Sequence, residues 1–191
     1  MEQLLGLNAL HVHQKHTVFV GNKYVVSSPS GEVLFYAKED AGFLGVTRGK
    51  NRSFYIDIFD TQDKLVIRLR RPFTYGPDKM DVTVNGVLTS VVRQERTLMK
   101  PVLNINNAND QHVLRVKGPI RVPFQGSADY EIFSSNKTRI GSIQKQWGGF
   151  WREAFSYADN FQLTFPEDLD VCFKAAIIGT TFLIDFLYYE K

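Results

Sequence analysis

VCFKAAIIGTTFLIDFLYYEK, residues 171–191, is the stretch on which the architecture of this chain depends. It is nearly all apolar and reads as a helix, whereas the rest of the chain is patterned as strands. A helix that is apolar all round must be buried in protein or in lipid. Its uninterrupted apolar part, residues 175–184, is ten residues long, whereas a membrane span needs about 17 to 25. The stretch therefore predicts a buried core helix more than a span.

Two charged residues, Lys174 and Asp185, bracket this apolar part. At about 100° per residue they lie on one face of the helix, roughly 16 Å apart along its axis. We expect this polar seam to reach solvent or partners at both ends of the helix. Lys174 and Asp185 are accordingly candidate contacts to lipid or membrane.

The composition is that of an ordinary globular protein, with 43% hydrophobic and 23% charged residues and a formal charge of +3. Its length fits one domain over residues 1–191. The mild positive charge favours anionic surfaces such as phospholipid headgroups, but it is too small to indicate nucleic-acid binding by itself. Cys172 is the only cysteine in the sequence, which excludes an intrachain disulfide and a cysteine-based zinc site and suits a reducing compartment. The start, MEQLLG, lacks the basic and apolar regions of a secretory signal, so we expect no secretion.

Between residues 17 and 146 one pattern recurs: an alternating run, a polar turn, and a second alternating run. Asn85-Gly86 lies between two such runs and is the strongest short hairpin signal. The five hairpins predicted in this way cover residues 23–36, 54–70, 80–92, 102–116 and 129–143.

Five hairpins give ten or more short antiparallel strands, which must close to remove their edges. A barrel of more than eight strands needs filling, and the apolar C-terminal helix is the obvious filler. The sequence therefore predicts a mainly β protein, a closed antiparallel barrel around a buried C-terminal helix. Elsewhere we expect helix only in residues 1–7 and near residues 151–157.

The last forty-five residues carry the most specific signal in the chain. Its elements are Trp147, residues 152–155, 158–161, Phe165-Pro166, 168–170, Lys174-Ala175, Ile178-Gly179, 182–186 and Glu190, with weaker matches upstream such as Arg71-Pro72 and Gly118-Pro119. In these residues the chain resembles the phospholipid scramblase family. The resemblance implies a Tubby-like barrel of about twelve strands, related to the Tubby C-terminal and LURP-one-related domains.

The same resemblance implies calcium-stimulated, ATP-independent movement of phospholipids between leaflets at the cytoplasmic membrane face. It also implies protein partners and, for some members, entry into the nucleus. Two departures bear on this expectation. Family members with a membrane role usually carry a cysteine cluster, taken as palmitoylated, after Arg-Pro, whereas residues 73–79 here contain no cysteine. We therefore expect no palmitoylation site. We also expect no proline-rich N-terminal extension, so the partner motifs of that extension do not transfer.

The family's calcium loop aligns with residues 157–168. An EF-hand loop needs oxygen ligands at positions 1, 3, 5, 9 and 12. Here position 3 is Asp159 and position 12 is Asp168, whereas positions 5 and 9 are Phe161 and Phe165. Two carboxylates predict at best a low-affinity calcium site.

Glu167 or Asp170 would have to assist such a calcium site. The alternative, which we favour, is that residues 161–165 alternate as a last barrel strand. Asp159 and Asp168 would then be cap residues before helices.

Two further groups of polar residues have two readings each. His11 and His13, with His16 nearby, place two imidazoles on one side of a strand, but no third metal ligand is visible and exposed histidines are common. Arg68, Arg70 and Arg71 with Lys64 form either a phosphate-facing strip or, since Arg68 and Arg70 alternate outward, a strand edge kept soluble.

Aromatic residues give weaker indications. Trp147 and Trp151 flank a Gly-Gly break and predict either an interfacial foot that inserts at headgroup depth or a core cluster that closes the barrel. Leu183, Tyr188 and Lys191 satisfy a cholesterol-recognition pattern.

Two functional hypotheses follow. In the first, the chain is a scramblase-family protein that acts on anionic phospholipid membranes at their cytoplasmic face, with calcium as a low-affinity cofactor. In the second, it is a soluble lipid- or protein-binding adaptor, located in the cytoplasm or also in the nucleus, whose helix stays inside the barrel. An enzyme is not expected, because the sequence has no nucleophile elbow, Walker loop or metalloprotease helix.

Overall fold

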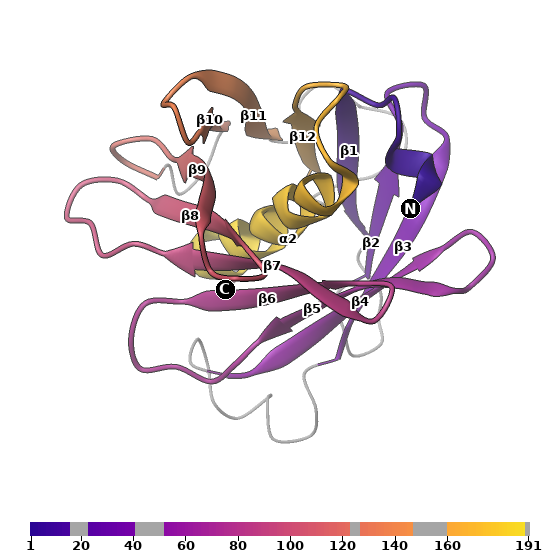
Figure 1. Cartoon of the computed structure of the whole chain (residues 1–191), viewed down its shortest axis with the longest axis horizontal. Helices are drawn as coiled ribbons and strands as arrows, with labels where there is room; N and C mark the ends of the chain where they lie inside the picture. Colours follow the sequence, from indigo (N-terminus) through magenta and orange to yellow (C-terminus); the bar gives the residue numbers. More distant parts are fainter. Residues whose placement is uncertain (16–22, 41–51, 123–126, 147–159, 190–191) are drawn as a thin grey trace.

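In the computed structural model of the protein, the residues described are 1–15, 23–40, 52–122, 127–146 and 160–189. Within them, twelve strands form a closed antiparallel barrel in which each strand pairs with its neighbours in sequence (Figure 1). The strands are β1 (Ala9–Lys15), β2 (Lys23–Ser27), β3 (Val33–Asp40), β4 (Phe54–Asp60), β5 (Leu65–Arg71), β6 (Lys79–Val84), β7 (Val87–Gln94), β8 (Val102–Asn107), β9 (His112–Lys117), β10 (Ala128–Ser134), β11 (Arg139–Gln146) and β12 (Asn160–Thr164).

The barrel closes between the first and the last strand. β1 pairs with β12 from Ala9 opposite Thr164 to His13 opposite Asn160. This pairing removes both free edges, as the hairpin pattern requires. Neither strand belongs to the five predicted hairpins; β12 was predicted as a last strand over residues 161–165, and β1 only as the strand that carries His11 and His13.

Side chains alternate between the interior and the outer surface of the barrel. Along β6, for example, Met80, Val82 and Val84 are buried and alternate with half-buried Lys79, Asp81 and Thr83. The period of two follows from the pleat, which points successive side chains to opposite faces. The inward residues of all strands line a space too wide for strand side chains alone to fill.

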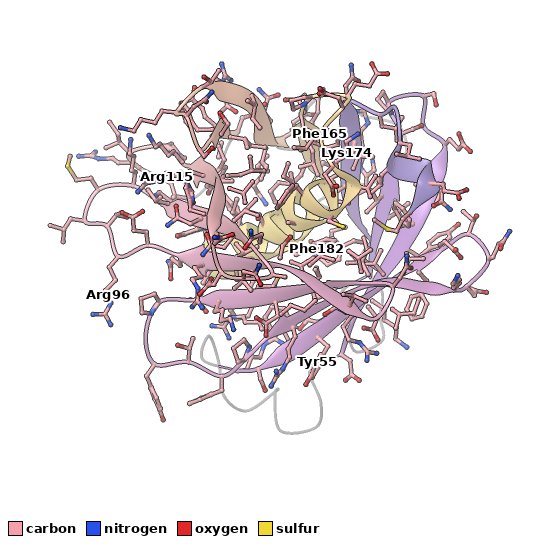
Figure 2. All side chains as sticks on the ribbon, in the orientation of Figure 1. Tyr55, Arg96, Arg115, Phe165, Lys174 and Phe182 are labelled. Atoms are coloured by element: carbon pink, nitrogen blue, oxygen red, sulfur yellow. The ribbon has the colours of Figure 1, made fainter. Side chains whose placement is uncertain are left out.

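Helix α2 (Val171–Tyr188) fills this space (Figure 1). Its residues from Lys174 to Phe186 are all buried, and each Ile, Leu and Phe side chain among them contributes roughly 1.5–3 kcal/mol through burial. Figure 2 shows Phe182 among the side chains that lie between α2 and the strands. Of the helices described, α2 is also the one that could cross a membrane by length and composition, but 72% of its eighteen residues are buried inside the barrel. The predicted barrel with a buried C-terminal helix is confirmed.

The two ends of the barrel differ in the length of their connections. At one end, which we call the turn end, two to six residues join successive elements, and at the other, the loop end, seven to thirteen do. The shortest connection is Asn85-Gly86, where both residues have positive φ, as the predicted two-residue hairpin turn requires. Because β12 runs towards the turn end, α2 runs back and ends at the loop end.

The predicted N-terminal helix of residues 1–7 is shorter in the structure. A single 3-10 turn, η1 (Glu2–Leu4), forms there. The chain leaves the helical conformation at Leu5, whose backbone is extended with a ψ of 140°, and Gly6 follows with a φ of 67°. The helix predicted near residues 151–157 lies outside the described residues.

Candidate functional site

At its turn end, helix α2 is held by a buried lysine. The Lys174 side chain has no exposed surface, and its Nζ donates to the backbone carbonyls of Leu4 at 3.0 Å, Leu7 at 2.8 Å and Glu167 at 2.7 Å. Burial lowers the pKa of Lys174, an effect that the Glu167 and Asp168 carboxylates oppose. Of the two outcomes expected for Lys174, contact with solvent or with partners, contact with solvent is wrong, because the N-terminal segment and the β12–α2 connection enclose its ammonium group and supply its acceptors.

Near its other end, the helix is held by a buried carboxylate. Asp185 is 3% exposed; it accepts a hydrogen bond from the Tyr24 hydroxyl at 2.9 Å and lies 3.5 Å from the Lys145 ammonium. Lys145 also lies 4.0 Å from the centre of the Tyr189 ring. Both charges of the polar seam are therefore buried: the N-terminal segment and the β12–α2 connection supply the partners of Lys174, and the barrel wall supplies those of Asp185.

The three neighbouring arginines of β5 do not form one strip. Arg68 and Arg70 point outward as predicted, and Arg68 donates twice to Asp57 at 2.7 Å. Arg71 points inward, where it pairs with Asp78 and lies 4.5 Å from the centre of the Phe186 ring. The phosphate-facing strip that included Arg71 is therefore wrong, because the alternation of the strand places Arg71 in the core.

Arg70 lies 4.0 Å from Asp81. The two outward arginines of β5 thus each have an acidic neighbour on the adjoining strand. Their role as membrane contacts stays a prediction.

The segment aligned with the family's calcium loop is mostly strand. Phe161 lies in β12 with its side chain in the barrel, and Phe165 follows the strand and is also buried. The strand reading of residues 161–165 is confirmed for all but its last residue. Asp159 lies outside the described residues.

The cap before α2 is Asp170, whose side chain accepts a hydrogen bond from the Cys172 amide at 2.7 Å. The prediction that Asp168 caps this helix is therefore wrong. Asp168 is exposed beside Asp170 at the rim of a hollow of about 570 Å³. Within the described part of the chain, no three His, Cys, Asp or Glu side chains gather closely enough to hold a metal ion. A calcium site stays a prediction.

The histidine pair is adjacent on β1. The rings of His11 and His13 are 6.0 Å apart, and burial together with His13 lowers the pKa of His11. His13 Nδ1 is hydrogen-bonded to Asn160 Oδ1 at 2.8 Å, which gives this imidazole a structural partner. His16 lies outside the described residues.

The cholesterol pattern is split by the fold. Leu183 is fully buried in the barrel, and the Tyr188 hydroxyl at the loop end accepts a hydrogen bond from Gln94 Nε2 at 3.1 Å. Lys191, Trp147 and Trp151 lie outside the described residues. The structure does not bring Leu183 and Tyr188 together on one accessible surface.

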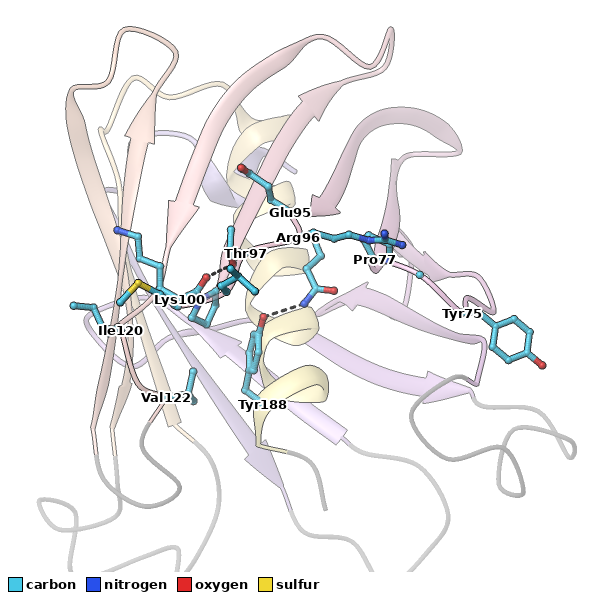
Figure 3. Close-up of a pocket in the computed structure, with 14 residues that line it drawn as sticks. Tyr75, Pro77, Glu95, Arg96, Thr97, Lys100, Ile120, Val122 and Tyr188 are labelled. Atoms are coloured by element: carbon cyan, nitrogen blue, oxygen red, sulfur yellow. Dashed lines mark hydrogen bonds between the residues drawn. The ribbon is translucent and has the colours of Figure 1, made fainter.

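A groove of about 640 Å³ lies at the loop end and was not predicted (Figure 3). The β5–β6, β7–β8 and β9–β10 connections line it, and Tyr188 at the end of α2 contributes to its lining. Burial raises the pKa of the Tyr188 hydroxyl. The groove brings the exposed side chains of Arg96 and Lys100 close to exposed apolar ones.

A sequence signal for this groove exists. Leu98 and Met99 stand between Thr97 and Lys100 in a connection where polar turn residues are expected. An apolar pair at such a place indicates either a buried loop or a contact surface, and in the structure both residues are exposed.

The comparisons with known proteins agree with this architecture. The family model named Scramblase matches residues 1–191. Phospholipid scramblase 1 of Mus musculus is 34% identical over 211 residues, which cover 100% of this chain and 64% of the relative. Phospholipid scramblase 2 of Homo sapiens is 31% identical and phospholipid scramblase family member 5 of Homo sapiens 30%; this chain covers 70% and 77% of their lengths and is itself covered completely.

Among solved structures, an X-ray structure of a protein from Arabidopsis thaliana superposes with a TM-score of 0.56 over 97% of this chain and 96% of that chain. Its sequence identity is 15%, so this likeness supports the fold alone. The resemblance noted in the sequence is confirmed by the family match over every residue and by the named relatives. The chain belongs to the Scramblase family.

Proposed function

We propose that this protein moves phospholipids between the leaflets of a membrane, without ATP and from its cytoplasmic face. The observation that carries the proposal is the match of the whole chain to the Scramblase family. The relatives at about one-third identity are named phospholipid scramblases. The chain spans 64% of the length of its mouse relative, so the activity of that longer protein is inferred for this chain and not transferred with the fold.

The structure constrains how such an activity would work. A lipid headgroup needs a polar path through the bilayer, and a single apolar helix offers none. In α2, moreover, Lys174 is bonded to the N-terminal segment and to the β12–α2 connection, and Asp185 is bonded to the barrel wall. We therefore propose that the protein acts from the membrane surface with α2 in place, by deforming the bilayer or by assembling with further copies.

A second candidate function is a soluble lipid- or protein-binding module that regulates other components. The burial of α2 favours it, because a helix that stays in the barrel serves as the core of an ordinary soluble domain.

The test is a liposome assay with two readouts. Purified protein is added to vesicles that contain phosphatidylserine and a labelled phospholipid, and both flotation with the vesicles and translocation of the label are measured. Flotation with translocation supports scrambling. Flotation without translocation supports the binding module. If the protein neither floats with the vesicles nor moves the label, both membrane proposals are wrong.

Calcium stimulation is tested in the same assay. Translocation is compared with and without calcium, for the unchanged chain and for Asp168→Ala. Asp168 is exposed and does not cap α2, so this substitution should leave the fold intact. Loss of calcium stimulation in Asp168→Ala would support a low-affinity site in this segment, and equal stimulation would place calcium elsewhere.

A further inference from the structure

Large apolar side chains are exposed at the tips of three loop-end connections. Leu98 is fully exposed, and Tyr75, Met99 and Ile120 are 89%, 70% and 66% exposed. All four line the same groove, so they form one surface. Figure 3 shows the Tyr75 ring pointing away from the helix. Exposed apolar side chains gathered in this way mark an interaction surface.

The charges of this surface have one sign. Arg96, Lys100 and Arg121 are exposed in the same connections, and among the described residues none of the three is in an ion pair. Figure 2 shows Arg96 projecting from the molecule. The acidic residues of these connections are neutralised within the barrel wall, since Asp78 pairs with Arg71 and Glu95 with Arg115.

The turn end has the opposite charge. Its connections and the N-terminal segment before β1 carry seven acidic residues, Glu2, Glu32, Asp63, Asp110, Glu167, Asp168 and Asp170, and two basic ones, Lys64 and Lys137. Asp110 pairs with Arg93 of β7, which leaves six acidic residues against two basic ones. An anionic surface would therefore attract the loop end and repel the turn end. This asymmetry orients the whole barrel relative to such a surface.

We propose that the loop end is the face with which this protein docks on an anionic phospholipid membrane. Leu98, Met99 and Ile120 insert at the level of the headgroups, and Arg96, Lys100 and Arg121 contact the lipid phosphates. A combination of apolar insertion and basic contacts is the pattern of proteins that lie on anionic bilayers. The inference rests on the proposed function and adds to it the contact surface and the orientation.

A bilayer fits this surface better than a protein partner does. The exposed apolar side chains belong to three separate connections around a groove, and the charged side chains exposed beside them are basic. A protein interface normally has an apolar centre depleted of charge, with a polar rim. A fluid anionic surface needs no such complementarity of shape.

The experiment is flotation with vesicles of phosphatidylcholine, with and without phosphatidylserine. The apolar variant is Leu98→Ser with Met99→Ser. Its matched control is Val87→Ser with Leu88→Ser, an exposed apolar pair at the turn end. The basic variant is Arg96→Gln with Lys100→Gln, and its control is Lys64→Gln with Lys137→Gln.

We expect both loop-end variants to lose at least about tenfold in binding to phosphatidylserine vesicles, and both controls to bind like the unchanged chain. The basic variant should also lose most of the salt dependence of binding. Unchanged thermal unfolding of all four variants shows that the fold is intact. Equal binding by the loop-end variants, or no binding by the unchanged chain, would overturn the docking face.

Translocation measured in the same vesicles separates this inference from the proposed function. If the unchanged chain docks through the loop end but moves no lipid, the docking face holds and the scrambling proposal fails. If the loop-end variants move lipid as well as the unchanged chain does, scrambling holds and the docking face fails.

Discussion

Lys174 and Asp185 show how single residues determine where α2 lies. In the sequence they limit the apolar run to ten residues; in the structure each is buried with hydrogen-bonding partners from the barrel or the N-terminal segment. Moving either buried charge away from its partners costs free energy, because a desolvated charge without hydrogen-bonding partners is unfavourable. These two residues therefore oppose the release of the helix, although in the sequence they look like its exposed ends.

Asp170 and Asp168 allow a direct test of capping at the start of α2. Asp170→Ala should lower the free energy of unfolding by about 1 kcal/mol, because the Cys172 amide loses its acceptor. Asp168→Ala should change it by less than about 0.5 kcal/mol, because Asp168 is exposed in the preceding turn. Urea denaturation without calcium measures both values. An equal loss in the two variants would contradict the assignment of the cap.

Asp110 predicts an acid-dependent part of the stability. Hydrogen bonds from Arg93 and Asn106 lower the pKa of this carboxylate from 3.8 to about 2. A carboxyl group with a lowered pKa in the folded state adds stability above pH 3.8, and this stability is lost as the pH falls through about 2. Asp110→Asn should therefore weaken the pH dependence of the unfolding temperature within that window. Asn tolerates the positive φ of this position, so the substitution adds no backbone strain. If the unfolding temperature of the variant falls with acid pH as steeply as that of the unchanged chain, the prediction is wrong.

At the scale of elements, the buried face of α2 holds the barrel together from inside. Ile178→Asp should lower the free energy of unfolding by several kcal/mol, because it places an unpaired charge among buried apolar side chains. Ile120→Asp, at an exposed loop-end position, is the matched control and should be close to neutral. Thermal unfolding in detergent-free buffer decides: an unchanged midpoint for Ile178→Asp would mean that α2 does not fill the barrel in solution.

Elements that are encoded locally were predictable from the sequence. The Asn85-Gly86 hairpin could be predicted, because both residues tolerate the positive φ that its turn requires. The inward direction of Arg71 follows from the alternation along β5, but its partners could not be predicted, because Asp78 and the Phe186 ring come from other elements. The burial of Lys174 could not be predicted either, because this residue is bonded to carbonyls about 170 residues earlier in the chain.

The loop-end groove was missed for a related reason. An apolar pair such as Leu98-Met99 in a connection does not reveal whether the fold will bury it. Only the closure of the barrel shows that three connections meet at one end and leave their apolar tips exposed.

At the scale of the molecule, the two ends of the barrel differ in charge, and the formal net charge of +3 does not reveal this difference. Acidic turns and the Lys174 anchor lie at one end. Exposed apolar and basic side chains lie at the other, where α2 ends. In the docked orientation the C-terminal end of α2 faces the bilayer, while Asp185, bonded to Tyr24 and Lys145, holds this end of the helix to the wall.

The remaining question is whether α2 stays in the barrel when the protein docks. We expect it to stay, since release would expose Lys174 and Asp185 and leave the apolar interior of the barrel unfilled.

Two single-cysteine variants test whether α2 stays in the barrel. Both are made in a Cys172→Ser background: Thr181→Cys, at a fully buried position of α2, and Met99→Cys, at an exposed loop tip. The thiol at position 181 should react with maleimide as slowly on phosphatidylserine vesicles as in solution, and rapidly in denaturant. A polarity-sensitive dye at position 99 should shift to the blue on the same vesicles. Rapid labelling at position 181 on vesicles would instead show that the helix leaves the barrel.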